Sequence, residues 1–87
     1  MNLDPLQRAE KIERASSLLM DAVKRLDMKT TGDWRVSEAN AAELIGYTVK
    51  SLQNIRLDGH GPKNYRIGVG NGSRISYRLH DLAEWIE

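Results

Sequence analysis

Apolar residues recur at spacings of three and four along the first part of the chain. They are Ile12, Ala15, Leu19, Ala22, Val23 and Leu26. At about 100° per residue these positions fall on one face of a helix, and charged residues surround the rest of it. Asp4 followed by Pro5 is a typical helix start, because Asp caps free backbone N–H groups and proline suits the first helical position. The pattern predicts an amphipathic helix over residues 5–26 and a polar linker over 28–33.

Two short segments with helical spacing follow, over 38–45 and about 49–57. Ser37 and Thr48 stand at their N-cap positions, and Gly46 can adopt the left-handed conformation that ends the first helix. The residues expected to face the core are Ala39, Ala42, Leu44 and Ile45 in the first helix, and Val49, Leu52, Ile55 and the stem of Arg56 in the second. Two helices joined by a tight turn are typical of a helix-turn-helix, although an ordinary helical hairpin has the same pattern.

Alternating apolar and polar residues over 65–69 and 74–78 predict two strands of a hairpin. Opposed residues share a face, so apolar residues should pair with apolar ones, which predicts an odd-numbered loop of three residues. One such register pairs Ile67 with Tyr77 and Arg66 with Arg78, and another pairs Arg66 with Ser76. In either register one face of the hairpin is expected to carry Arg66, Arg74, Ser76 and Arg78.

The last segment, 81–87, predicts a C-terminal helix. His80 and Asp81 mark its start, and Leu82, Trp85 and Ile86 form an apolar stripe that we assign to the core. The predicted fold class is therefore α+β and mostly helical. Residues 33–87 are expected to form a winged helix-turn-helix with a two-stranded wing hairpin, and residues 1–32 an added amphipathic helix and linker.

The composition narrows the class of protein. The 87 residues are 40% hydrophobic and 29% charged and include no cysteine, and no apolar run approaches the ~20 residues that span a membrane. The absence of cysteine favours a reducing, cytoplasmic compartment and excludes a thiol nucleophile. His60 and His80 lack metal-ligand spacing, and no serine has a base at a recognisable spacing. We therefore expect no enzyme, no metal or other cofactor, and no small-molecule substrate.

The net charge of +1 hides an uneven distribution. Residues 47–78 hold six bases and one acid, a net charge of +5, and the rest of the chain has a net charge of −4. Such asymmetry is typical of a surface that binds a polyanion, and a solvated face with uneven charges is the alternative that charge alone leaves open. On a helical wheel Tyr47, Lys50 and Asn54 point outward, and Ser51 and Gln53 lie on the flanks. An outward face without Glu favours DNA, whereas a protein-interaction module that binds an acidic partner is the alternative from another class.

From Trp34 to the C-terminus, the order of motifs resembles the small winged helix-turn-helix proteins of the excisionase and AlpA-regulator type, in the MerR-like superfamily. The residues that carry the resemblance are Ser37-Glu38-Ala39, Ala42, Leu44-Ile45-Gly46, Ser51-Leu52, Arg56, Gly59-His60-Gly61-Pro62, Arg66-Ile67-Gly68, Arg74, Tyr77-Arg78 and Asp81-Leu82-Ala83-Glu84-Trp85-Ile86. Each motif is weak alone, but their order is fairly specific.

The resemblance implies sequence-specific binding to double-stranded DNA, by a transcriptional regulator or an excisionase that is cytoplasmic and nucleoid-associated. The second helix would enter the major groove, and the wing would lie along the backbone or minor groove. The implied base-reading residues are Lys50, Ser51, Gln53 and Asn54. The residues implied at the DNA backbone are Tyr47, Thr48, Arg56, Lys63, Arg66, Arg74, Ser76 and Arg78. A related alternative is the DNA-recognition subunit of a phage packaging complex.

Two features depart from the family pattern. The N-terminal helix is not part of the family core, and its heptad spacing lasts only about two heptads, too short for an autonomous coiled coil. Packing on the winged domain and homodimerisation are equally weighted uses for it, and either would help a domain of ~55 residues, which is marginal in size. The second departure is the wing tip, Asn71-Gly72-Ser73, which has no basic residue and so argues against deep insertion into the minor groove.

Overall fold

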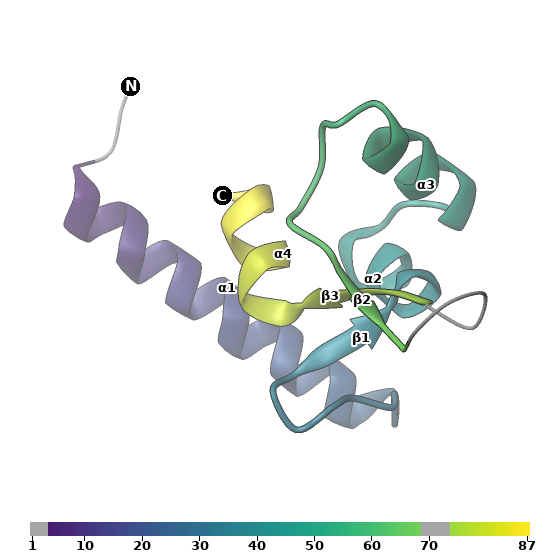
Figure 1. Ribbon diagram of the computed structural model, residues 1–87. Helices are drawn as coiled ribbons and strands as arrows, with labels where there is room; N and C mark the ends of the chain where they lie inside the picture. The colour runs from purple at the N-terminus through teal and green to yellow at the C-terminus, as the bar shows by residue number, and fades with distance from the viewer. Residues whose placement is uncertain (1–3, 69–73) are drawn as a thin grey trace.

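The computed structural model describes residues 4–68 and 74–87. Their helices and strands are α1 (Pro5–Arg25), β1 (Arg35–Ser37), α2 (Glu38–Ile45), α3 (Val49–Leu57), β2 (Tyr65–Ile67), β3 (Arg74–Arg78) and α4 (Leu79–Ile86). The strands form an antiparallel sheet in the order β1-β3-β2 (Figure 1). The α+β, mostly helical class is as predicted, but the sheet has a third strand, β1, that the prediction of a two-stranded hairpin lacked. None of the helices in the described residues is both long enough and apolar enough to cross a membrane.

The helix starts follow the local signals in the sequence. Asp4, Ser37 and Thr48 are the N-caps of α1, α2 and α3, as predicted, and each side chain accepts a hydrogen bond from the backbone N–H three residues later, at 2.9, 3.1 and 3.0 Å. Gly46 ends α2 with a φ of 80°, in the left-handed region. A cap bond joins residues only three positions apart, so these boundaries depend little on the rest of the fold.

α1 packs mainly against α4 and also touches α2. Its buried residues belong to one hydrophobic core with residues of the sheet and the other helices, and they are Ile12, Ala15, Leu19 and Val23. In Figure 1, α1 runs behind α4 on the side of the molecule away from the viewer. A hydrogen bond of 3.4 Å from the Arg8 guanidinium to the Glu84 carbonyl also ties the two helices. Intramolecular packing is thus one use of α1, whereas dimerisation through α1 and a domain boundary near residue 32 stay predictions.

Two of the predicted core positions in α2 and α3 are wrong. Ala39 is exposed and Ala41 is fully buried, because the buried stripe of α2 begins at Glu38 and continues three and four residues later. Val49 is 40% exposed, although it lies one turn before the fully buried Leu52. It stands at the start of α3, in a run of exposed residues that covers the turn between the two helices.

α4 begins at Leu79, before the start that His80 and Asp81 marked in the sequence. Leu79 and Leu82 are buried, as a core-facing stripe requires, and Trp85 is half-buried. Ile86, which the stripe placed in the core, is 46% exposed. The last turn of α4 therefore has less cover than the apolar pattern predicted.

The register of the β2–β3 hairpin differs from both predicted registers. Ile67 pairs with Arg74, Arg66 with Ile75, and Tyr65 with Ser76. The connection between the paired ends is even-numbered, so apolar residues of one strand do not face apolar residues of the other. Val69, which was predicted to extend the strand, and the wing tip 71–73 lie outside the described residues.

The central position of β3 explains the register. β3 pairs with β1 on its other side, where Val36 lies opposite Tyr77, and these two buried side chains form the covered face of the sheet. The other face, here called the outer sheet face, carries Tyr65 and Ile67 with Arg35, Arg74, Ser76 and Arg78. Arg66 shares the covered face with Ile75, so the prediction that it lies with Arg74, Ser76 and Arg78 is wrong. Matching apolar residues across the hairpin was a poor guide to the strand register, because Tyr65 is not a core residue.

Leu19→Ala tests the packing of α1 and should lower the free energy of unfolding by about 2 to 4 kcal/mol, because the truncation loses apolar burial and leaves a cavity. Leu18→Ala is the matched control: this neighbour is 70% exposed, and its loss should change stability by less than about 0.5 kcal/mol. Urea denaturation measures both. Equal effects of the two substitutions would contradict the packing of α1 on the core.

Candidate nucleic-acid interface

The outer face of α3 presents the four side chains predicted to read bases. Lys50, Ser51, Gln53 and Asn54 are all exposed, whereas Leu52 in their midst is fully buried. In Figure 1, α3 lies at the upper right, above the sheet. The face therefore combines an ammonium, a hydroxyl and two amides, which can donate to and accept from base edges.

The first turn of α3 is stiffened by side-chain hydrogen bonds. The Thr48 hydroxyl accepts from the backbone N–H of Ser51 and donates to the Ser51 hydroxyl oxygen at 2.8 Å. Tyr47, just before this cap, packs edge-on against Trp85, with ring centroids 5.6 Å apart and an interplanar angle of 67°. The start of α3 is thus held both by its cap and by a contact with α4.

A part-buried carboxylate holds the other end of α3. Glu38 Oε2 accepts hydrogen bonds from the Tyr77 hydroxyl and from Arg56 Nε, both at 2.7 Å, and Oε1 accepts from a terminal nitrogen of Arg56 at 3.2 Å. The side chains of Arg56 and Glu38 are 20% and 11% exposed, and Tyr77 is fully buried. The three residues join the start of α2, the end of α3 and the central strand.

The pKa shifts of Glu38 and Tyr77 follow from the surroundings of the two side chains. Burial alone would raise the pKa of Glu38, but the hydrogen bonds from Arg56 and Tyr77 outweigh it and hold the pKa below its ordinary value. Burial, together with the neighbouring carboxylate, raises the pKa of Tyr77 well above its ordinary value. The Arg56 guanidinium is paired with Glu38, so this residue has an internal role, and the phosphate contact that the resemblance implied for it stays a prediction.

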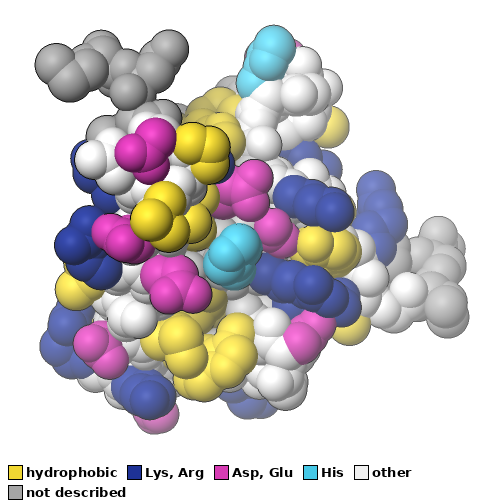
Figure 2. Space-filling view, turned by 90° about the vertical axis from the view of Figure 1, so that its left-hand side faces the viewer, with side chains coloured by type: hydrophobic (Ala, Val, Ile, Leu, Met, Phe, Trp, Pro, Cys, Tyr) yellow, Lys and Arg dark blue, Asp and Glu magenta, His cyan; other side chains and the backbone are white. Residues whose placement is uncertain are grey.

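On the outer sheet face, three cations surround the ring of Tyr65. The guanidinium carbons of Arg35 and Arg78 each lie 4.9 Å from its centroid, and Lys63 Nζ lies 5.7 Å from it. Such contacts are favourable because the ring face is electronegative. The Tyr65 hydroxyl donates to Asp81 at 2.9 Å, which fixes the ring. Figure 2 shows Lys and Arg side chains gathered in its right-hand half, whereas acidic and basic side chains alternate on the left.

The Asp33 carboxylate lies beside both arginines. Arg35 and Arg78 are directly opposed in the β1–β3 register, which is unfavourable for two like charges. Asp33 Oδ2 accepts from Arg35 Nε at 2.7 Å and lies 3.3 Å from a terminal nitrogen of Arg78. Its Oδ1 accepts from the Thr31 hydroxyl. The hydrogen bonds from Thr31 and then Arg35 lower the pKa of Asp33, so the carboxylate is charged at neutral pH.

The predicted backbone-contact residues do not form one surface. Those exposed to solvent are Tyr47, Thr48, Lys63, Arg66, Arg74 and Arg78. Ser76 is 2% exposed and its hydroxyl donates to the Tyr65 carbonyl at 3.1 Å, so it is not accessible to a ligand. The sheet brings Lys63 and Arg78 together at Tyr65, whereas Arg66 lies on the opposite face from Arg74.

Sequence reasoning missed Arg35 and Tyr65 on the outer sheet face and Asp33 beside it. A signal for one of them was present: Arg35 alternates with Trp34 and Val36, which places it opposite the buried side of a short strand. The strand was not predicted because three residues are too few for a clear period. Tyr65 was counted among the apolar positions of an alternating strand, and Asp33 was assigned to the linker.

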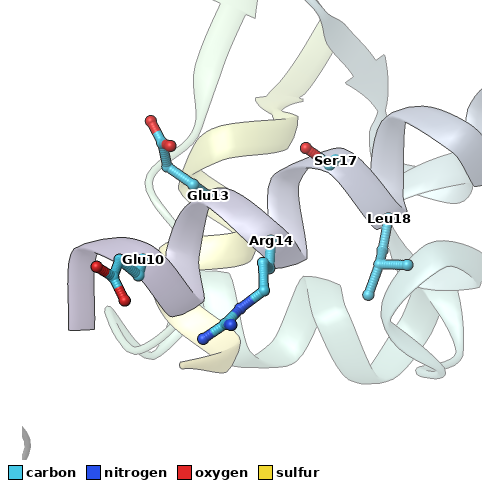
Figure 3. Close-up of a pocket in the computed structure, with 5 residues that line it drawn as sticks. All are labelled: Glu10, Glu13, Arg14, Ser17 and Leu18. Atoms are coloured by element: carbon cyan, nitrogen blue, oxygen red, sulfur yellow. The ribbon is translucent and has the colours of Figure 1, made fainter. Parts of the chain in front are cut away.

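An open hollow of about 550 Å³ lies on the solvent side of α1 (Figure 3). Its lining residues are Glu10, Glu13, Arg14, Ser17 and Leu18. All five come from one helix, and in Figure 3 Glu13 projects away from Arg14 and Leu18. The side chains therefore do not converge on a bound atom, as a catalytic site requires.

One group in the described residues has donor atoms close enough to hold a metal ion. The ligand atoms of His80, Asp81 and Glu84 in α4 lie within 4.8 Å of one another. Sequence reasoning did not select them. Asp81 already accepts the hydrogen bond from Tyr65, and His80 and Glu84 are exposed, so we assign no ion to this group.

Comparison with protein-family models gave no match, and searches of curated proteins and of solved structures gave no significant match. The function of the chain therefore has to be inferred from its own residues.

Glu38→Gln should lower the free energy of unfolding by about 1 to 3 kcal/mol at pH 7, because it removes the charge that Arg56 and Tyr77 hydrogen-bond inside the fold. Glu43→Gln is the control, since Glu43 is exposed on the same helix and its loss should have little effect. The pKa of Glu38 is lowered on folding from an ordinary 4.5, so its contribution is present above that pH and is lost as the pH falls through the folded pKa. Urea titrations from neutral to acid pH should show the difference between wild type and Glu38→Gln shrinking on acidification, and a constant difference would contradict the assignment.

Proposed function

We propose that this chain binds double-stranded DNA with sequence preference, as a transcriptional regulator or an excisionase. The observation that carries the proposal is the outer face of α3, where Lys50, Ser51, Gln53 and Asn54 are exposed around a helix that Leu52 fixes to the core. An α-helix fits the major groove, where amides hydrogen-bond to adenine and ammonium groups to guanine. In this proposal α2 and α3 form the helix-turn-helix, and the β2–β3 hairpin is the wing.

The charge of the outer sheet face supports the same partner. Arg35, Lys63, Arg74 and Arg78 lie on this face or beside Tyr65, and cations of this kind bind phosphates without regard to base sequence. Such contacts supply most of the affinity and set the position of the reading helix on the duplex. The proposed division of roles is therefore selectivity from α3 and affinity from the sheet.

Two of the residues implied by the resemblance are left out of the proposed contacts. Arg56 is held by Glu38 in a bidentate ion pair, and Ser76 is buried in β3 with its hydroxyl donating to the Tyr65 carbonyl of β2. Both stabilise the elements that carry the interface. Gln53 stays in the reading face, although its amide also contributes a hydrogen bond that lowers the pKa of Glu38.

The salt dependence of duplex binding tests the proposal. With about four to six phosphates neutralised, log K should fall with log salt at a slope of about −4 to −5 between about 50 and 200 mM salt. Fluorescence anisotropy of a labelled duplex, selected from a random pool by repeated binding, gives the slope. A slope near zero, or failure to retain any duplex at low salt, would contradict the proposal and favour a protein partner.

Two substitutions test the division of roles. Asn54→Ala should relax the preference at one base pair by about 1 to 3 kcal/mol, because it removes an amide that pairs with a base edge. Arg74→Ala should weaken all sequences alike and make the salt slope shallower by about 0.9. Ser17→Ala, on the solvent side of α1, is the control and should change neither. The division is wrong if Arg74→Ala alters the selected sequence and Asn54→Ala does not.

A further inference from the structure

Three donors from separate segments converge on the carboxylate of Asp33. They are the Thr31 hydroxyl in the linker, Arg35 Nε in β1, and a terminal nitrogen of Arg78 at the end of β3. The backbone N–H of Arg35 donates to the Thr31 oxygen at 3.0 Å, so the hydroxyl hydrogen is left to point at Asp33. Thr31, Arg35 and Arg78 therefore form a complete site, here called the seat, for one anion with two oxygens.

Tyr65 prepares this seat for an anion. Its ring lies 4.9 Å from each of the two guanidinium carbons, and its own hydroxyl is held by Asp81. Arg35 and Arg78 would repel each other in their opposed positions without a negative charge between them. Side chains that are already ordered lose less freedom when a ligand arrives, which favours binding.

The carboxylate that fills the seat is open to exchange. The side chains of Asp33 and Arg78 are 43% and 44% exposed, and an exposed ion pair contributes little to stability. A backbone phosphodiester has the same single negative charge and also offers two charged oxygens, which suit a guanidinium. Asp33 thus imitates the group that the outer sheet face would meet on a duplex.

We propose that Thr31, Arg35 and Arg78 form a binding site for a phosphate of the DNA backbone, and that Asp33 occupies this site until DNA displaces it. The inference rests on the DNA binding proposed above. It adds Thr31 to the interface, assigns one phosphate to Arg35 and Arg78 together, and makes Asp33 an internal competitor that lowers the affinity for all sequences equally.

Asp33→Asn tests the competitor, with Asp21→Asn as the matched control. Both substitutions remove one negative charge, and Asp21 is exposed on α1 and makes none of the contacts with Thr31, Arg35 and Arg78 that hold Asp33. Asp33→Asn should bind the selected duplex about two- to fivefold more tightly than Asp21→Asn does, because no ion pair has to be broken first. The slope of log K against log salt should be steeper by up to about 0.9 for Asp33→Asn. In this variant the phosphate replaces only ions from solution in the seat, because no carboxylate occupies it.

Arg35→Gln tests the seat from the other side. In the wild-type background it should weaken binding by about three- to tenfold, as loss of a charged phosphate contact does. Arg25→Gln, at the exposed end of α1, is the control for charge. In the double variant Asp33→Asn/Arg35→Gln the gain from Asp33→Asn should disappear, and melting curves show whether each variant is folded.

The outcomes separate this inference from the proposed function. If the wild type binds DNA but Asp33→Asn binds no more tightly than Asp21→Asn, Asp33 is a structural ion pair and the inference is wrong while DNA binding stands. A gain that survives in the double variant would equally overturn the seat. If no variant binds any duplex at low salt, both proposals fail.

Discussion

The carboxylate of Glu38 is the constraint on which the geometry of this molecule depends. A charge removed from water is costly unless hydrogen bonds replace its hydration. Here Arg56 and Tyr77 supply three of them, from α3 and from the central strand β3. Glu38 therefore ties the end of α3 to the central strand, and its loss would leave Arg56 and Tyr77 without their common acceptor. This internal contact positions the face that carries Lys50 and Asn54.

The arginines of the chain serve two different purposes. Arg56 is enclosed and tied to Glu38, whereas Arg35 and Arg78 lie on the outer sheet face with Asp33 across them. The surplus of positive charge in residues 47–78 therefore counts Arg56, which is enclosed in the fold. It also leaves out Arg35, which lies on the outer sheet face but outside that segment. Glu38 lies beside Arg56 and Asp33 lies beside Arg78, so two of the positive charges in residues 47–78 are balanced by acids from outside that segment.

Much of the candidate interface could be predicted because the signals involved are local. The caps at Ser37 and Thr48 join residues three apart, and the exposed face of α3 follows from helical periodicity around Leu52. The outer sheet face could not be predicted in the same way. Its key residue, Tyr65, has the character of a core residue, and β1, which supplies Arg35, is too short for its alternation to be distinctive.

The starts of α1, α2 and α3, the amphipathic face of α1 and the polar face of α3 were thus readable from residue spacing, since each arises from contacts within one or two turns. The strand register, the face of the sheet on which the residues of β2 lie, and the partner of Arg56 were not. A strand has two faces, and packing against a third strand and α2 decides which one is buried. The pairing of Glu38 with Arg56 and Tyr77 spans 18 and 39 residues of sequence, a distance at which no local pattern constrains which carboxylate meets which cation.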